Sequence, residues 1–194
     1  MQVLKVGHMK ERLARLARWR GTQGFGVQSP SAYRFIRYVV CEQDPYYCYD
    51  DLLQRFPNIT GQKLRLYRLY FRLSNYAQAV EWIVNGGWTS ELDAYVRAGC
   101  HCTRLSSAPS SAVGYRVFLM RFMDGWQHFC DEVLGQADES VMLVVEGIHS
   151  NRQNSRYWRE LEKSEHTGVT FDLYYCGIVF FDRRYFKMNY QANF

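Results

Sequence analysis

An acidic residue and a histidine stand three positions apart at the end of the most apolar run of this sequence, SVMLVVEGIHS (140–150). The acid is Glu146 and the histidine is His149. Imidazole changes its charge near neutral pH, so a histidine beside a carboxylate can act as a general base or as a ligand. A second acid, Asp124, precedes a helical pattern, where aspartate ordinarily caps the helix. His149 could therefore add a base or a ligand beside Glu146, although Glu146 could equally be an ordinary acid at the end of a strand.

Other kinds of reactive site have no motif in this chain. It contains no G-x-S-x-G elbow, no P-loop and no H-E-x-x-H. Its six cysteines include no C-x-x-C pair, and Cys100-x-Cys102 is too isolated for a zinc site, which needs four ligands. Free thiols suit a reducing compartment, so we expect a cytoplasmic protein.

Strand-like and helix-like patterns alternate from residue 79 to residue 194. We expect strands at 79–84, 100–105, 115–123 and 140–148, helices at 89–98, 125–135 and 151–163, two strands within 167–182, and an edge strand within 186–194. Alternation of this kind predicts an open α/β sheet, in which 140–148 is a buried parallel strand.

The first 76 residues differ in charge from the rest of the chain. They contain 13 Lys and Arg against 5 Asp and Glu, whereas residues 77–194 contain 11 against 14. We expect residues 1–76 to form a basic helical extension or cap, and residues 77–194 to form the α/β domain. The extension is predicted to have helices at 9–20, 30–41 and 61–75, with a polar connection at 42–60. Ser29-Pro30 has the residue types of an N-cap followed by the first helical position.

Three arginines, Arg65, Arg68 and Arg72, line up on one side of the helix expected at 61–75. They predict either a solvated helix face or a phosphate-binding face. The aromatic residues near them could stack on bases in a nucleic acid, or could belong to the core; these are Trp19, Tyr33, Tyr67 and Tyr70.

The stretch GVQSPSAYRFIRYVV (26–40) resembles the GVHSP-type signature of a group of bacterial class I S-adenosylmethionine (SAM)-dependent methyltransferases. LYRLYFRLSNY (66–76) is similar to the helix before the first strand of those proteins, and residues 141–194 are similar to their C-terminal part. The resemblance implies a Rossmann-like sheet of seven strands, the last of them antiparallel. The cofactor would lie at the carboxyl ends of the first strands.

The resemblance also implies site residues. The nucleotide loop falls at EWIVNGGWTS (81–90), so the residues expected to bind SAM are Glu81, Gly86, Gly87, Thr89 and, at the end of the second strand, Ser106. Glu146 and His149 would act on the methyl acceptor. Related methyltransferases of the catechol type hold a divalent metal at the positions of Asp124 and Glu146. Two carboxylates and one histidine are few ligands for a hard cation, so a divalent metal is not expected.

Three departures from the family predict a modified cofactor side. Ile83 stands where the family has its first glycine, and its branched side chain would crowd a ligand that approaches the backbone. Ser106 replaces the carboxylate expected to bind the ribose. About nine residues separate the second and third strands, fewer than a βαβ crossover needs, so we expect a sheet of fewer than seven strands.

These observations leave three hypotheses for function. The chain is an active SAM-dependent methyltransferase acting on a small-molecule or nucleic-acid acceptor, a methyltransferase-like domain kept as a non-catalytic binding or regulatory module, or a basic nucleic-acid-binding protein. The start MQVLKVGHMKERLARL has no continuous apolar segment, and no run of about 18 apolar residues occurs, so neither a secretory signal nor a membrane association is expected.

Overall fold

The computed structural model describes residues 29–184 and 186–194. Its helices are α2 (Pro30–Phe35), the π-helix η1 (Ile36–Val40), α3 (Cys48–Arg55), α4 (Gly61–Ala77), α5 (Ser90–Gly99), α6 (Trp126–Gly135) and α7 (Arg152–Lys163). Its strands are β1 (Glu81–Val84), β2 (Arg104–Ser106), β3 (Arg116–Met120), β4 (Val141–Glu146), β5 (Val169–Asp172), β6 (Cys176–Phe180) and β7 (Met188–Gln191). The predicted α/β alternation is therefore confirmed, whereas the helix expected at 9–20 lies outside the described residues.

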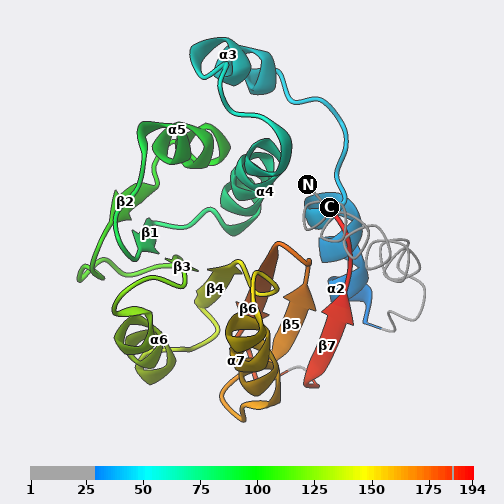
Figure 1. Ribbon diagram of the computed structural model, residues 1–194, viewed down its shortest axis with the longest axis vertical. Helices are drawn as coiled ribbons and strands as arrows, with labels where there is room; N and C mark the ends of the chain where they lie inside the picture. The colour runs from blue at the N-terminus through cyan, green and yellow to red at the C-terminus, as the bar shows by residue number, and fades with distance from the viewer. Residues whose placement is uncertain (1–28, 185) are drawn as a thin grey trace, which may run out of the picture.

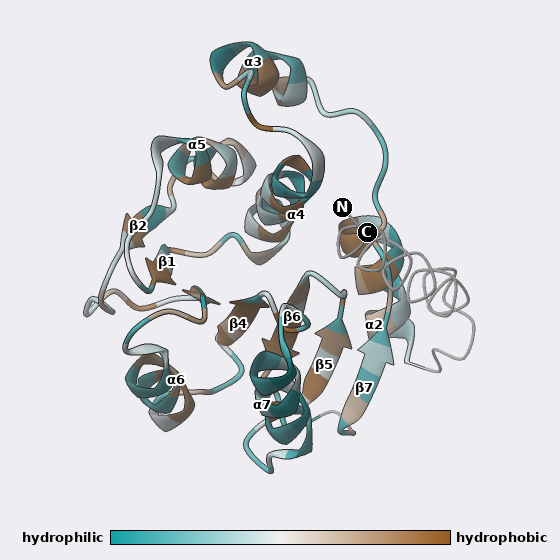
Figure 2. Ribbon diagram, viewed as in Figure 1, coloured by the Kyte–Doolittle hydropathy of each residue, from teal (hydrophilic) through white to brown (hydrophobic). Residues whose placement is uncertain are grey.

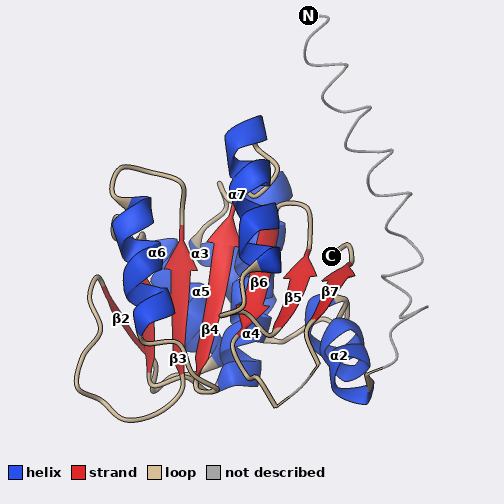
Figure 3. Ribbon diagram, turned by 90° about the horizontal axis from the view of Figure 1, so that it is seen from below, coloured by secondary structure: helices blue, strands red, loops and turns tan. Residues whose placement is uncertain are grey.

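The strands form one sheet in the order β2-β1-β3-β4-β6-β5-β7 (Figure 1). Every neighbouring pair is parallel except the two that β6 makes, with β4 and with β5. The carboxyl ends of β1, β3, β4 and β5 therefore meet at a single edge of the sheet, which we call the carboxyl edge (Figure 3). A mostly parallel sheet with helices on both faces is the Rossmann-like arrangement.

The described sheet has seven strands, so the expectation of fewer than seven was wrong. The short connection between the second and third strands does lack a helix, because residues 107–115 run directly from β2 to β3. Strand β7 adds a member at the opposite end of the sheet, beside β5. Strand β2 is also shorter than expected and begins later, because residues 101 and 102 form a turn between α5 and the strand.

Each face of the sheet has its own hydrophobic core. Helices α6 and α7 cover one face, and α4 and α5 cover the other (Figure 3). The strands are among the most hydrophobic segments, whereas most residues of α7 are hydrophilic (Figure 2). Phe35 of α2 and Leu69 of α4 belong to the same core as Trp82 of β1 and Phe171 of β5. The described helices of the region predicted to be a cap thus pack in the same hydrophobic core as the strands.

The start of that cap follows its sequence signals. The Ser29 hydroxyl accepts a hydrogen bond from the Ala32 amide, and Pro30 begins α2, as predicted. The helix expected at 30–41 changes at Ile36 into a π-helical turn, where the Cys41 amide donates to the Ile36 carbonyl. Helix α3 lies where the sequence had predicted only a polar connection.

The arginines of α4 do not form one solvated face. Arg72 is buried, and it donates to the carbonyl oxygens of Val39 and Val40 at the end of η1. The Arg68 guanidinium lies 4.8 Å from the centre of the Tyr49 ring. Only Arg65 of the three is exposed, so the predicted phosphate-binding stripe is not presented to solvent. Tyr67 and Tyr70 are buried and belong to the core.

Among the described residues, no helix is both long and apolar enough to span a membrane.

Candidate functional site at the carboxyl edge of the sheet

The first part of the carboxyl edge is the turn between β1 and α5. Strand β1 ends at Val84, and Gly86 and Gly87 then adopt φ values of +69° and +80°, which a residue with a Cβ adopts only with strain. Helix α5 follows, with the Thr89 hydroxyl accepting from the Leu92 amide as its N-cap. The predicted strand, glycine turn and helix are therefore present at this edge.

Asn85 ties this turn to the end of β3. Its Oδ1 accepts from the Arg121 amide at 2.8 Å, and its Nδ2 donates to the Arg121 carbonyl at 2.8 Å. The two strand ends are thus held at a fixed separation by a side chain that is almost completely buried. A side-chain amide can make both bonds because it carries a donor and an acceptor side by side.

The side chain of Arg121 extends along the carboxyl edge and makes hydrogen bonds on both sides. Its Nη1 donates to the Gly87 carbonyl at 2.9 Å, and its Nε donates to Glu146 Oε2 at 3.3 Å. The guanidinium therefore joins the turn after β1 to the last residue of β4. Arg121 and Glu146 keep 27% and 24% of their side-chain surface exposed, so solvent reaches this ion pair.

Glu146 is held from its other side by a phenol. Tyr70 of α4 is fully buried, and its hydroxyl donates to Glu146 Oε1 at 2.6 Å. Burial raises the pKa of Tyr70 well above its usual value, and the negative charge of Glu146 raises it further. The phenol therefore remains a donor, and the carboxylate is fixed between a neutral hydroxyl and a cation.

His149 belongs to a second group at the same edge. Its Nε2 lies 2.8 Å from Oδ2 of Asp172, the buried last residue of β5, and its Nδ1 lies 3.2 Å from the Ser155 hydroxyl in α7. The Tyr174 ring lies 5.5 Å from the imidazole, and Tyr174 has a φ of +72°, uncommon for a residue with a side chain. An imidazole oriented by a carboxylate has the arrangement of a positioned base.

Strand β6 lies between Glu146 and Asp172. Cys176, the first residue of β6, pairs with Glu146, and Gly177 pairs with Asp172. Burial raises the pKa of the Cys176 thiol well above its usual value, and the charges of Glu146 and Asp172 raise it further. The two acids therefore lie on either side of β6, and the Glu146 and His149 groups adjoin one another at the carboxyl edge.

Two of the residues expected to bind a cofactor are not available for it. Glu81 lies at the other end of its strand, and the Ser106 hydroxyl already makes a hydrogen bond within the chain. Glu81 is the first residue of β1, so it lies at the opposite end of the strand from Gly86 and Gly87. It is buried there, where its Oε2 accepts from the amide and the hydroxyl of Ser110. Ser106 does lie at the carboxyl end of β2, paired with Ile83, but its hydroxyl donates to the Ala108 carbonyl.

The expected metal ligands are not gathered into one site. Asp124 is exposed, and helix α6 takes Gly125 as its N-cap without a side-chain bond, so the expected capping by Asp124 is not observed. Glu146 is engaged instead by Tyr70 and Arg121. The described part of the chain contains no group of three or more His, Cys, Asp or Glu side chains placed to hold a metal ion.

The space next to the glycine turn is filled by the chain itself. A Cβ placed on Gly86 would lie only 2.1 Å from Sδ of Met123, so the Met123 side chain rests directly on the glycine backbone. Met123, which is 41% exposed, and Arg121, which reaches the Gly87 carbonyl, both lie beside the ends of β1 and β3. Open α/β sheets ordinarily bind a nucleotide in the crevice at this place.

Sequence reasoning named Glu146, His149 and the glycine turn, which lie at the carboxyl edge, but did not name Tyr70, Arg121 and Asp172 for this edge. Only Asp172 had a usable signal, because an acid that ends an apolar strand in a parallel sheet must lie at the carboxyl edge.

Comparison with known proteins finds no matching family model, no matching curated protein and no matching solved structure.

Proposed function

We propose that this chain is a SAM-dependent methyltransferase-like protein that works as a binding or regulatory module rather than as a catalyst. The observation that carries the proposal is the position of Arg121, whose guanidinium spans the carboxyl edge from the Gly87 carbonyl to the Glu146 carboxylate. A nucleotide cofactor in this crevice would have to displace a charge-assisted hydrogen bond.

The rest of the edge supports the same proposal. Met123 covers Gly86, where a cofactor would need the bare backbone. Strand β2 ends in Ser106 without a carboxylate to accept hydrogen bonds from ribose hydroxyls. The resemblance implies that the last strand is antiparallel, whereas here the last strand, β7, is parallel to β5 and the antiparallel strand is β6, which lies between β4 and β5.

Isothermal titration calorimetry of the full chain with SAM and with S-adenosylhomocysteine tests this proposal. We expect no saturable binding at ligand concentrations up to about 1 mM, equivalent to an affinity weaker than about −4 kcal/mol. The double variant Arg121→Ala/Met123→Ala reopens the crevice, and binding gained by the variant alone would identify these side chains as the block. Micromolar binding by the unaltered chain would overturn the proposal.

One observation favours an active methyltransferase as the second candidate. The His149–Asp172 hydrogen bond places an oriented imidazole at the carboxyl edge, where a methyl acceptor would need a base. If the unaltered chain binds SAM, methyl transfer from labelled SAM to small-molecule and nucleic-acid acceptors should depend on His149. His149→Ala should then lower the rate by roughly 100-fold or more, with SAM affinity unchanged.

The nucleic-acid-binding alternative has less support, because Arg72 is buried and Arg68 lies against Tyr49. A binding curve to RNA or DNA across a salt series tests it, since phosphate contacts release counterions. Affinity that does not change with salt would exclude it.

A further inference from the structure

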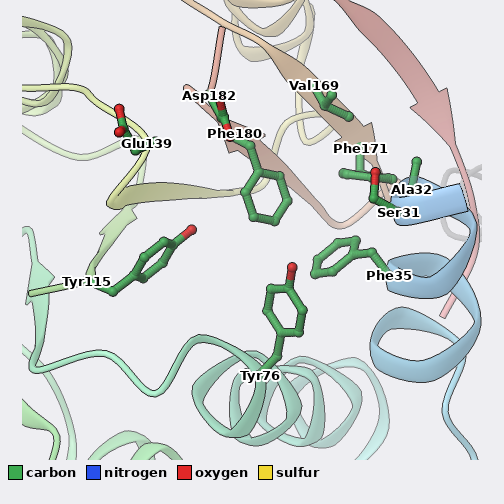
Figure 4. Close-up of a pocket in the computed structure, with 10 residues that line it drawn as sticks. All are labelled: Ser31, Ala32, Phe35, Tyr76, Tyr115, Glu139, Val169, Phe171, Phe180 and Asp182. Carbon is green, nitrogen blue, oxygen red and sulfur yellow. The ribbon is translucent and has the colours of Figure 1, made fainter. Parts of the chain in front are cut away.

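A pocket of about 240 Å³ lies at the edge of the sheet opposite Glu146 and His149. Tyr115, directly before β3, and Val169, at the start of β5, place it at the amino ends of the parallel strands. Figure 4 shows it between helix α2, the end of α4 and the strand ends. None of the residues proposed above to replace a cofactor lines it.

Aromatic side chains make up five of the ten described residues that line this pocket. Phe35 of α2 lies 5.1 Å from the Tyr76 ring and 5.1 Å from the Phe180 ring, in edge-to-face arrangements. The hydroxyls of Tyr76 and Tyr115 both point into the space beside Phe180 (Figure 4). Ring faces and phenol oxygens turned toward one space present partial negative charge to whatever occupies it.

Two carboxylates, Glu139 and Asp182, line the pocket. An adjoining open depression shares both residues and adds Asp138, Arg183 and Arg184. Arg184 pairs with Asp182 at 2.8 Å, so it offsets one of the three carboxylates. No Lys or Arg lines the pocket itself among the residues that the structure describes.

We propose that this pocket binds a small organic cation, an ammonium group carried on a short apolar or aromatic body. The rings contact the body, and the ring faces with the two phenol oxygens attract the cation, which the carboxylates attract as well. At about 240 Å³ the pocket is smaller than the roughly 300–1,000 Å³ of sites for drug-sized ligands, so the ligand carries about one ring.

The electrostatic environment of Tyr115 agrees with this charge preference. Burial is the main cause that raises the pKa of its phenol far above the usual value, and the nearby Tyr76, Asp138 and Asp182 raise it further. The same carboxylates that disfavour a phenolate would favour a cation. An anionic ligand of equal shape would meet the same repulsion as the phenolate.

This inference does not depend on the proposed function, because the pocket and the carboxyl edge are at opposite ends of the strands. Its test is calorimetric titration of the full chain with phenethylammonium, with 2-phenylethanol as the neutral match and phenylacetate as the anionic one. We expect saturable binding of the ammonium, binding of the alcohol weaker by about tenfold, and no binding of phenylacetate. Equal affinity for ammonium and alcohol, or no ammonium binding at all, would overturn the inference.

Variants on accessible side chains locate the binding. Tyr76 is 51% exposed and Glu139 is exposed, so Tyr76→Ala and Glu139→Gln are expected to fold, as thermal melting verifies. Each should weaken ammonium binding by about fivefold, and Glu139→Gln should leave alcohol binding unchanged. Tyr38→Ala is the control, since Tyr38 is 67% exposed and does not line the pocket. Unchanged ammonium affinity in both pocket variants would also overturn the inference.

Discussion

The hydroxyl of Tyr70 donates a 2.6 Å hydrogen bond to the carboxylate of Glu146, although 76 positions separate the two residues in the chain. The bond joins helix α4, which belongs to the basic extension, to the last residue of the central strand β4. It therefore couples the packing of the cap to the charge arrangement at the carboxyl edge. A residue outside the predicted α/β domain therefore helps to hold the Glu146 carboxylate in place.

Tyr70→Phe removes this bond and leaves the ring in place. Because the bond is made to a carboxylate, we expect the free energy of unfolding to fall by about 1–2 kcal/mol, measured by urea denaturation. Tyr67→Phe is the matched control, since the Tyr67 hydroxyl lies 3.3 Å from the neutral Thr89 hydroxyl. It should lose only about 0.5 kcal/mol. Equal losses in the two variants would show that the charge of Glu146 contributes nothing.

Local patterns predicted the elements well where one signal sufficed. The Ser29-Pro30 helix start, the buried strand β4 and the glycine turn at Gly86-Gly87 all depend on neighbours in sequence, and all are present. Helix α3 was missed because its stability comes from packing. The rings of Tyr46 and Tyr49 lie 4.7 and 5.2 Å from that of Phe71 in α4, a contact that no local pattern reports.

The candidate site was predictable only in part for a related reason. Glu81 was expected beside the glycine turn, but the apolar residues after it extend β1 to Val84 and leave Glu81 at the far end of the strand. Arg121 lay inside the strand expected at 115–123 and had no motif of its own. Its role follows from the sheet order, which brings the end of β3 between those of β1 and β4.

Gly177→Ala is expected to lower the free energy of unfolding by about 2–3 kcal/mol. A Cβ at Gly177 in β6 would lie 2.3 Å from Cη2 and Cζ3 of Trp158, which is completely buried. Urea denaturation measures the loss. Adding Trp158→Phe should recover part of it, giving a favourable interaction energy in the double-mutant cycle.

The control for this variant is Gly135→Ala. A Cβ at Gly135, the last residue of α6, meets nothing within 4 Å. Its effect should stay within about 0.5 kcal/mol or be stabilising. A similar loss of stability in both variants would mean that the loss in Gly177→Ala comes from the general effect of replacing glycine on the backbone, and not from contact with Trp158.

Cys41 should resist alkylation at neutral pH. Burial raises the pKa of its thiol to about 11, although Arg37 and Arg72 act in the opposite direction. Since the thiolate is the reacting species, iodoacetamide should modify Cys41 much more slowly than the exposed Cys102 at pH 8, as peptide mass spectrometry would record. In urea the two should react alike. Equal rates in the folded chain would contradict this.

The same shift sets a pH dependence of stability. The folded-state pKa of Cys41 is above the ordinary value of 9.0, so the unfolded chain loses this proton first as the pH rises. The contribution of the neutral thiol is complete below about pH 9 and is lost between about pH 9 and pH 11. Cys41→Ala should reduce the fall in melting temperature over this interval, compared with Cys102→Ala.

Arg72 is expected to be the most costly arginine of α4 to replace. Its Nε and Nη2 donate to the carbonyls of Val39 and Val40, at 2.6 and 3.1 Å, where η1 ends without further helical partners. Arg72→Ala leaves these buried acceptors without their donor, so we expect a loss of about 2–4 kcal/mol in urea denaturation. The loss in free energy of unfolding for Arg72→Lys should be smaller than for Arg72→Ala but not zero, because an ammonium lacks the planar fork that reaches two carbonyls. Arg65→Ala, on the exposed side of the same helix, should change stability by less than about 0.5 kcal/mol. An effect at Arg72 as small as the one at Arg65 would mean that Arg72 is not held by these carbonyls, and would restore the solvent-facing stripe and, with it, the case for phosphate binding.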